Sequence, residues 1–287
     1  MAGLNGTNTH VAKTIKLYIG GAFPRTESGR SFPVYTAESK KLYAHLCRAS
    51  RKDARNAVAA AKSAINGWSS RSAYNRGQIL YRMAEMLEGK RSEFVDTFVE
   101  TLGYSQDEAD NAVDEGIDAF VYYAGFADKY QQVIGAVNPV SGPHHNFTTP
   151  EPVGVVAMLG SDKFHFGQLI SRIASIVCSG NTLVLLLAEK GAAILAPLAE
   201  VFATSDLPGG VINLLTGFLD ELYIHMASHM EVDSICCEFT EGEITAKVKE
   251  EAVHNLKRVV VTPRIEPGLQ SVLDFVELKT VWHPVGF

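Results

Sequence analysis

The most regular pattern of hydrophobic and polar positions lies in residues 150–217. Short apolar runs bounded by turn residues alternate there with segments in which apolar residues recur at intervals of three and four. The runs are typical of strands buried on both faces of a parallel sheet, and the intervals are typical of helices packed against such a sheet. In chain order the pattern predicts strand 153–159, helix 166–177, strand 182–187, helix 192–203 and strand 211–215.

The same alternation continues further along the chain. It predicts, in order, helix 219–230, strand 232–237, helix 245–254 and strand 256–261. Parallel strands joined through helices form right-handed crossovers, and such sheets bind ligands in a crevice at the carboxyl ends of their strands. The predicted fold class is therefore α/β, with a doubly wound parallel sheet.

Before this alternating region the pattern predicts a hairpin. Strands 16–19 and 31–35 are expected to pair around a turn at 27–30. Residues 1–13 are polar and are expected to form a disordered leader. The folded part of the chain is thus expected to begin near residue 14.

Helices are predicted after the hairpin. Ser50, with Asp53 three residues later, is a typical cap for a helix that runs to about residue 66. The following sequence is rich in residues that favour helices. Further helices are predicted at 73–88, 90–101 and 105–132. Residues 134–149, which carry two prolines and a glycine at their centre, then interrupt the helical pattern.

Composition narrows the classes of protein to consider. The 287 residues suffice for one large or two ordinary domains. Hydrophobic residues make up 46% of the chain, charged residues 20%, and the formal net charge is −6, so no basic field would attract nucleic acid. No apolar run approaches the roughly 18 to 20 residues that span a bilayer, and the polar start lacks the apolar core of a signal peptide. These features predict a cytoplasmic protein with neither a nucleic-acid partner nor a membrane partner.

The cysteines offer one candidate for nucleophilic chemistry. Four cysteines are too few and too irregularly spaced for a disulfide scaffold or a zinc ribbon. Cys236 and Cys237 lie in a predicted buried strand, where thiols are usually inert. A catalytic role for either would require an electropositive and partly exposed thiol.

Two pairs of histidines are candidate metal ligands. His144 and His145 are neighbours on extended chain, so their side chains would point to opposite faces and are expected to be exposed loop residues. His225 and His229 are spaced by one helical turn, but no carboxylate follows them in the arrangement of a metalloprotease. We therefore predict no metal site.

Three segments of the alternating region resemble, in order and spacing, the cofactor-binding domain of the NAD(P)-dependent aldehyde dehydrogenase superfamily. They read EPVGVV at 151–156, SGNTLVLLLAE at 179–189 and LPGGVINLLTG at 207–217. The resemblance extends to the amino-terminal helices and to residues 273–282, whose Glu-Leu-Lys-Thr-Val core is similar to the family's last strand. It implies a Rossmann-like cofactor-binding domain made of residues 14–133 and 150–262.

The resemblance also implies that a domain is missing. In the family a catalytic domain, which supplies the nucleophilic cysteine, precedes the last strand, and no such domain fits between Val261 and Leu273. Residues 134–149 and 269–287 correspond to the family's oligomerisation elements, a protruding hairpin and a terminal strand that reaches a neighbouring subunit. The side chains expected at that interface are Phe275, Leu278, Val281 and Trp282.

Most of the positions that bind the cofactor or perform catalysis in the family differ here. The residues that replace the oxyanion asparagine, the ribose-binding lysine, the pyrophosphate turn and the general base are, in that order, Lys163, Leu186, Glu241 and Thr262. A carboxylate under the pyrophosphate would repel a dinucleotide. Glu189 and Gly217 remain as candidate cofactor-binding residues. We predict no catalytic residue, and NAD is a cofactor only by resemblance.

The chain is similar to the degenerate second module of bimodular aldehyde dehydrogenases, present here as a separate chain. The leading hypothesis is a non-catalytic subunit that binds a full-length aldehyde dehydrogenase, or forms a homo-oligomer, through its hairpin and terminal strand. One alternative is an active NAD-dependent oxidoreductase with a relocated nucleophile at Cys236 or Cys237. Another is a sensor that binds a nucleotide without turnover.

Overall fold

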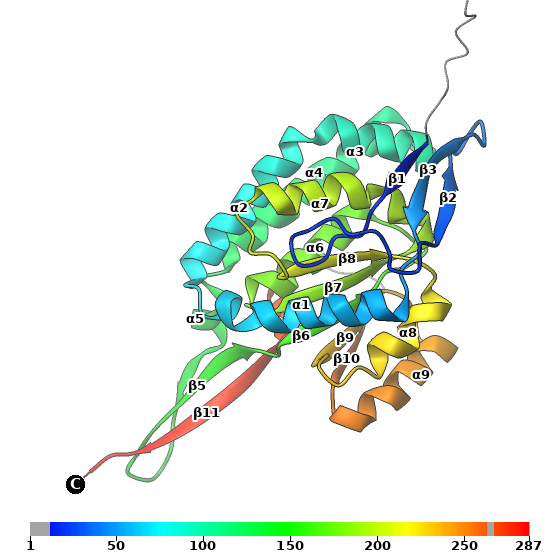
Figure 1. Ribbon diagram of the computed structural model, residues 1–287. Coiled ribbons are helices and arrows are strands. Elements are labelled where there is room, and N and C mark those ends of the chain that lie inside the picture. The colour runs from blue at the N-terminus through cyan, green and yellow to red at the C-terminus, as the bar shows by residue number, and fades with distance from the viewer. Residues whose placement is uncertain (1–11, 263–266, 287) are drawn as a thin grey trace, which may run out of the picture.

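The computed structural model describes residues 12–262 and 267–286. Its centre is a five-stranded sheet in the order β10-β9-β6-β7-β8, in which all neighbouring strands are parallel. The strands are β6 (Val155–Leu159), β7 (Thr182–Leu187), β8 (Ile212–Thr216), β9 (Ser234–Cys237) and β10 (Arg258–Val261). The chain winds outward from β6 to β8 and then returns to add β9 and β10 on the other side of β6 (Figure 1). The predicted doubly wound parallel sheet is confirmed, and the winding reverses between β6 and β9.

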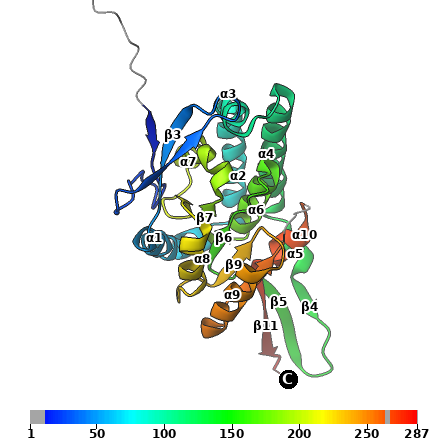
Figure 2. The ribbon, with the colours of Figure 1, turned by 90° about the vertical axis from the view of Figure 1, so that its right-hand side faces the viewer.

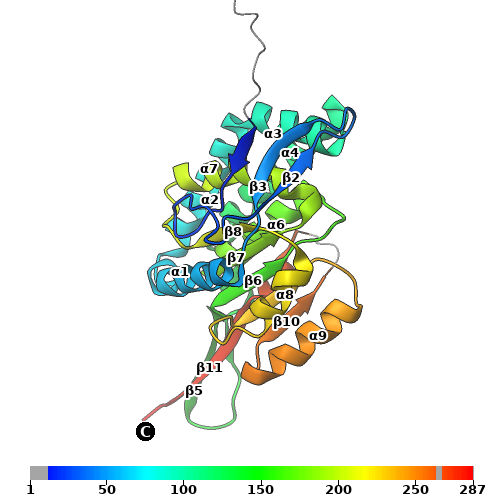
Figure 3. The same cartoon turned by 45° about the vertical axis from the view of Figure 1, so that its right-hand side comes forward.

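Helices cover both faces of this sheet (Figure 3). One face is covered by α2 (Ala73–Gly89), α3 (Arg91–Thr97), α4 (Gln106–Phe126), α6 (Phe166–Cys178) and α7 (Leu195–Thr204). The other is covered by α1 (Arg51–Ser69), α8 (Leu219–Ala227) and α9 (Glu243–Ala252). Short helical segments are α5 (Tyr130–Ile134), the π-helix η1 (Phe98–Leu102), the 3₁₀-helices η2 (Glu189–Ile194) and η3 (Val253–Asn255), and α10 (Leu269–Leu273). None of the helices in the described ranges is both long and apolar enough to cross a membrane.

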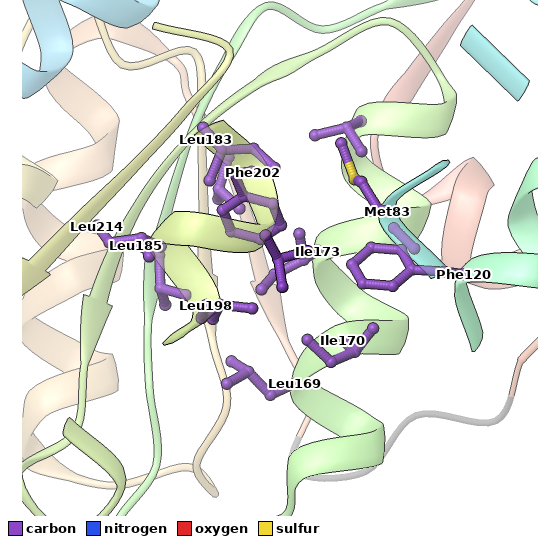
Figure 4. Packing of buried hydrophobic residues seen from close by; sticks show 14 of the residues in the cluster. Met83, Phe120, Leu169, Ile170, Ile173, Leu183, Leu185, Leu198, Phe202 and Leu214 are labelled. Atoms are coloured by element: carbon purple, nitrogen blue, oxygen red, sulfur yellow. The ribbon is translucent and has the colours of Figure 1, made fainter. Parts of the chain in front are cut away.

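The central strands divide their side chains between two hydrophobic clusters. In β7, Leu183 and Leu185 belong to the cluster under α6 and α7, whereas Val184 and Leu186 belong to the cluster under α1 and α8. Figure 4 shows Leu183 and Leu185 close to Phe202 of α7. Burying one such side chain contributes about 1.5–3 kcal/mol, and successive residues of a strand point to opposite faces. A strand in which every residue is apolar therefore requires helices on both sides of the sheet.

The first helix begins at the predicted cap. The Ser50 hydroxyl accepts the backbone N–H of Asp53, and the Asp53 carboxylate accepts the backbone N–H of Ser50 at 2.8 Å. The same carboxylate accepts the hydroxyl of Thr26 at 2.6 Å, so the cap also anchors the preceding loop. This capping box satisfies N–H groups that the first turn of a helix leaves without partners. The helix is confirmed and ends at Ser69.

The predicted amino-terminal hairpin is wrong in its pairing. The structure has a three-stranded sheet in the order β1-β3-β2, formed by β1 (Lys13–Ile15), β2 (Ser31–Tyr35) and β3 (Leu42–Cys47). Residues 31–35 pair antiparallel with β3, because the chain reverses at 36–41 with Lys40 in the left-handed region, φ 52°. Tyr18, in the predicted strand 16–19, instead exchanges backbone hydrogen bonds with Leu214 of β8. Long-range pairing with the large sheet thus competes successfully with the local turn.

Other predicted elements have different bounds. The predicted helix 105–132 is α4 followed by α5, because the chain turns at 127–129 and places the Tyr130 ring in the core, 1% exposed. The predicted strand 273–282 begins at Val276, since the preceding residues form α10. Residues 1–11 of the predicted leader lie outside the described residues, and the first strand already begins at Lys13. Element types were therefore predicted better than element ends.

A three-stranded antiparallel arm extends from the body of the molecule. It consists of β4 (Ala136–Asn138), β5 (His144–Pro152) and β11 (Val276–Pro284), in the order β11-β5-β4. In Figures 1 and 2 the arm projects away from the helices, and the carboxyl terminus lies near its far end. The strands within the predicted segments 134–149 and 269–287 thus meet in one sheet, although they are separated by most of the α/β domain.

Candidate functional site

The carboxyl ends of the central strands meet where the winding of the sheet reverses. Gly160 and Ser161 follow β6, Ala188 follows β7, Glu238 follows β9 and Thr262 follows β10. Doubly wound sheets bind ligands at this position. The hollow lined by these residues has a volume of about 20 Å³. This suffices for about one water molecule, whereas small-molecule sites usually have about 300–1,000 Å³.

Aromatic side chains occupy the space next to this hollow. A Cβ atom added at Gly191, in η2, would lie 2.1 Å from the Phe164 ring, so the ring is packed directly on the glycine backbone. Phe164 also lies 6.1 Å from Phe98, measured between ring centroids. Phe166, 1% exposed, packs against Phe94 and Phe98. The turn after β6 is therefore held against η2 by hydrophobic contacts.

Of the residues at the four altered family positions, Lys163 and Thr262 both line this hollow, whereas Leu186 and Glu241 do not. Lys163 is exposed, and its backbone N–H donates to the Ser161 hydroxyl at 3.1 Å. Leu186 is 2% exposed and belongs to the hydrophobic cluster under α1. The backbone N–H of Thr262 donates to the carbonyl of Cys237 at 3.1 Å, which continues the sheet ladder. The contacts of Leu186 and Thr262 are those of structural residues.

The two candidate cofactor-binding residues differ in their surroundings. Glu189 begins η2 and is exposed, and partial desolvation together with the carboxylates of Asp162 and Asp220 raises its pKa. Gly217 is buried beneath α8, and a Cβ added there would lie 3.3 Å from Leu222. The close approach of Leu222 leaves little room for a side chain at position 217, which explains the glycine there.

Carboxylates surround the amino-terminal end of α9. Glu241, just before this helix, lies 2.6 Å from the Lys249 ammonium group, and Glu243 in its first turn lies 2.8 Å from Lys247. These hydrogen bonds lower the pKa of both carboxyl groups, so both are ionised at neutral pH. Negative charge at this helix end suits the helix dipole and disfavours an approaching phosphate.

A buried charge cluster lies beside the hollow. The Arg172 side chain of α6 is 1% exposed, and its guanidinium group lies 3.4 Å from the carboxylate of Asp274 and 3.9 Å from that of Glu238. The guanidinium carbon also lies 5.5 Å from the centre of the Phe275 ring. Burial raises the pKa of Glu238 to about 7, and the positive charge of Arg172 opposes this rise. The cluster connects α6 to the end of β9 and to the turn that precedes β11.

Sequence reasoning missed this cluster. The available signal was an arginine within the almost entirely apolar helix 166–178 and a glutamate directly after the buried strand 234–237. Buried charges are rare unless they are paired. Two of the Arg172 nitrogens, Nε and Nη2, have no hydrogen-bond partner among the described residues.

All four cysteines are buried and free. Burial raises the pKa of Cys178, Cys236 and Cys237 to about 12 in each case. A thiolate is the reactive form of cysteine, and at neutral pH these groups are thiols. Cys237 lies at the carboxyl end of β9, which is the position a relocated nucleophile would require, but it is 0% exposed.

In neither of the two histidine pairs of the sequence do the two members lie on one face of the same element. His225 lies in α8, but that helix ends at Ala227, so His229 is not on its next turn. The Nδ1 atom of His229 accepts the backbone N–H of Glu231 at 3.2 Å. His144 and His145 are exposed and lie on opposite faces of β5, as predicted, with the His144 ring against Trp282. They belong to a strand, so their assignment to a loop was wrong.

The predicted interface residues do not share one face. Phe275 is 0% exposed and packs under Arg172, so its assignment to the interface is corrected: it is a core residue. Leu278 and Trp282, 55% and 61% exposed, lie on one face of β11, and Val281 lies on the other. Residues of a strand alternate between faces. The exposed apolar residues of the arm are therefore available on two sides.

Comparison with known proteins relates the whole α/β domain to one family. The model of the "Aldehyde dehydrogenase family" matches residues 23–262. Mitochondrial benzaldehyde dehydrogenase of Antirrhinum majus is 31% identical over 251 residues, 86% of this chain and 46% of that protein. Human retinal dehydrogenase 2 is 32% identical over 257 residues, 87% of this chain and 48% of that protein.

Solved structures agree with these sequence matches. The NAD+ complex of aldehyde dehydrogenase from Bacillus cereus superposes with a TM-score of 0.80 at 27% identity, over 87% of this chain and 50% of that chain. The chain thus spans about half the length of the relatives it matches. Matching order, spacing and fold over residues 23–262 leave one conclusion: this chain belongs to the aldehyde dehydrogenase family.

Proposed function

We propose that the chain is a non-catalytic member of its family that associates, through the arm formed by β4, β5 and β11, with a full-length aldehyde dehydrogenase. The observation that carries this proposal is a contrast within one molecule. The arm forms a complete three-stranded sheet and exposes apolar side chains. The hollow at the strand ends, in contrast, has room for only about one water molecule, and the neighbouring thiols are buried. Function follows from the site rather than from the fold.

The connection between the sheet and the arm supports this reading. β10 ends at Val261 and α10 begins at Leu269, so residues 262–268 make the whole connection. The relatives are about twice as long as this chain. A domain that supplies a nucleophile cannot be formed by so short a connection. Residues 262–268 also contain no cysteine that could serve as the nucleophile.

The outer edge of β11 supplies a mechanism for association. β11 lies at one edge of the arm and pairs with β5 along its other side, over the whole range from Val276 to Pro284. An edge strand presents unpaired N–H and carbonyl groups that a strand of another chain can join. Leu278 and Trp282 would add apolar contacts on one face of the joined sheet. These two side chains, which are exposed in the single chain, would then be buried in the complex.

An active enzyme with a relocated nucleophile has less support. The pKa of about 12 for Cys236 and Cys237 leaves almost no thiolate at neutral pH. A nucleotide sensor would require space at the strand ends, and Phe164 is packed there on Gly191. Both alternatives predict binding of a nucleotide, which a shift in melting temperature with NAD(H), ADP or ATP would detect.

The decisive experiment is co-purification with this chain as bait. We expect a stoichiometric complex with a full-length aldehyde dehydrogenase, whose NAD-dependent activity is lost when the partner's own cysteine is replaced. The Leu278→Asp/Trp282→Asp variant should no longer capture the partner. Met230→Asp, at an exposed apolar residue away from the arm, is the matched control and should capture it normally. NAD-linked activity in the purified chain alone would contradict the proposal.

A further inference from the structure

We propose that His145 and His283 form a binding site for a divalent transition-metal ion, with Zn²⁺ as the natural choice, on the face of the arm opposite to Trp282. This inference is independent of the proposed association with an aldehyde dehydrogenase. It rests on the pairing of β5 with β11, which joins residues that are 138 positions apart in the sequence. The sequence pair His144 and His145 could not form this site, because its members face opposite sides of β5.

The register places the two imidazoles side by side. His283 is directly opposite His145 in the antiparallel ladder, and the neighbouring pairs are Trp282 with Asn146 and Pro284 with His144. Directly opposite residues of an antiparallel pair lie on the same face, with Cβ atoms about 4.5–5.5 Å apart. Two imidazoles at that separation can bind one ion between them at the usual metal–nitrogen distance of about 2.0–2.1 Å.

The hydrogen-bond pattern fixes this pair further. The backbone N–H of Val285 donates to Pro143 and that of Val153 donates to Phe275, at the two ends of the ladder. Because hydrogen-bonded pairs alternate with non-hydrogen-bonded pairs, His145 and His283 form a hydrogen-bonded pair. Their Cα atoms are then about 5.5 Å apart and are held by two backbone hydrogen bonds. The backbone of the site exists before any ion binds.

Side-chain contacts hold the same register along the arm. The hydroxyls of Thr148 and Thr280 are 2.9 Å apart across the two strands. The Lys279 ammonium group donates to the Glu151 carboxylate at 2.5 Å. A shift of β11 by one residue would move the His283 side chain to the face opposite to that of His145. The contacts therefore oppose the register change that would destroy the site.

The surroundings leave room for an ion and its water molecules. Both histidines are exposed and line a hollow of about 480 Å³, together with Phe147, Pro284, Val285 and Gly286. The His145 ring packs edge to face on Phe147, with 5.5 Å between the ring centroids, which restricts its rotation. The next cross-strand pair on this face, Phe147 with Val281, is apolar and offers no metal ligand, so water would complete the coordination.

The ligand set indicates the class of metal. Imidazole nitrogens suit Zn²⁺, Cu²⁺ and Ni²⁺, whereas Mg²⁺ and Ca²⁺ prefer oxygen ligands. No group of three or more histidine, cysteine or carboxylate ligands occurs in residues 12–262 and 267–286. The site is therefore a two-histidine chelate with open positions. An ion bound there would link β11 to β5 near the far end of the arm.

The test is calorimetric titration of the full chain with Zn²⁺ alone, and with Mg²⁺ as a comparison metal. We expect one Zn²⁺ ion per chain, no binding of Mg²⁺, and loss of the Zn²⁺ site in both His145→Ala and His283→Ala. His144→Ala removes a neighbouring histidine on the other face and should bind as the unaltered chain does. Stoichiometric binding retained in either His145→Ala or His283→Ala, or lost in His144→Ala, would overturn the proposal.

A second measurement separates chelation from general effects on folding. Zn²⁺ should slow amide hydrogen exchange in β11 and β5 of the unaltered chain and of His144→Ala, because the ion links the two strands. Zn²⁺ should not change the amide exchange rates of His145→Ala or His283→Ala. Without metal, the exchange rates of these two variants should match those of the unaltered chain. Equal slowing of exchange in all four proteins would show that Zn²⁺ acts elsewhere.

Discussion

Replacing Glu238 with glutamine should change how the stability of the protein depends on pH. The Glu238 side chain is 13% exposed, and burial raises its pKa to about 7 from an ordinary value of 4.5. Glutamine keeps nearly the same shape but does not ionise. Arg172 would keep its closer carboxylate partner, Asp274, at 3.4 Å. The substitution therefore removes one buried charge while the other ion pair remains.

The direction and size of the effect follow from proton linkage. The raised pKa means that between pH 4.5 and about 7 the folded state binds more protons at this group than the unfolded state does. The stability contributed by this proton is fully present below pH 4.5 and is lost as the pH rises to about 7. At about 1.4 kcal/mol for each pH unit, the loss amounts to on the order of 3 kcal/mol. The Glu238→Gln variant does not undergo this loss.

Urea unfolding at several pH values would measure this effect. We expect the free energy of unfolding of Glu238→Gln, relative to the unaltered chain, to increase by on the order of 3 kcal/mol between pH 4.5 and pH 7.5. Glu243→Gln is the control, because the pKa of Glu243 is lowered by Lys247 and its side chain is 82% exposed. A relative stability that stays constant or decreases over this range would refute the reasoning. It would mean that the attraction to Arg172 equals or outweighs the effect of burial on the carboxylate.

Three further predictions concern the cap, the core and the thiols. Ser50→Ala should lower the free energy of unfolding by about 1 kcal/mol, because it removes the hydroxyl that caps α1; urea unfolding would show it, with Ser63→Ala in the middle of the helix as the control. Trp68→Ala should cost about 3–5 kcal/mol, since the indole is 0% exposed and donates to the Val177 carbonyl at 3.0 Å; a cost below 1 kcal/mol would contradict this packing. Ellman's reagent should label the cysteines of the native chain slowly and all four after unfolding; rapid labelling of Cys237 in the native chain would show that its thiol is accessible.

The charge cluster and the arm are connected through one short segment. Asp274 contacts Arg172, Phe275 packs beside it, and β11 begins at the next residue, Val276. The Asn181 side chain donates to the carbonyl of Phe275 at 2.8 Å. These contacts fasten the start of the arm to α6 and to the turn before β7. The arm is consequently an extension of the folded core at its base, although its far end is exposed.

The sequence by itself determined the order and type of the central elements. The runs predicted as strands at 182–187 and 232–237 are typical of strands buried on both faces of a sheet, and the helical periods between them predict the helices that cover it. The cap at Ser50 is likewise a local signal, because its partner Asp53 lies three residues away. The family was also recognisable, because the order and spacing of its motifs are present in the sequence.

Only the tertiary structure decided which distant residues meet. The pairing of 31–35 with β3 in place of 16–19, the burial of Phe275, and the contact between Arg172 and Glu238 all depend on long-range packing. The clearest case is His145 beside His283, which results from the register of two strands at opposite ends of the α/β domain. Hydrophobic periodicity shows that a strand is buried or exposed, but it does not specify its partner, because many pairings bury the same apolar area.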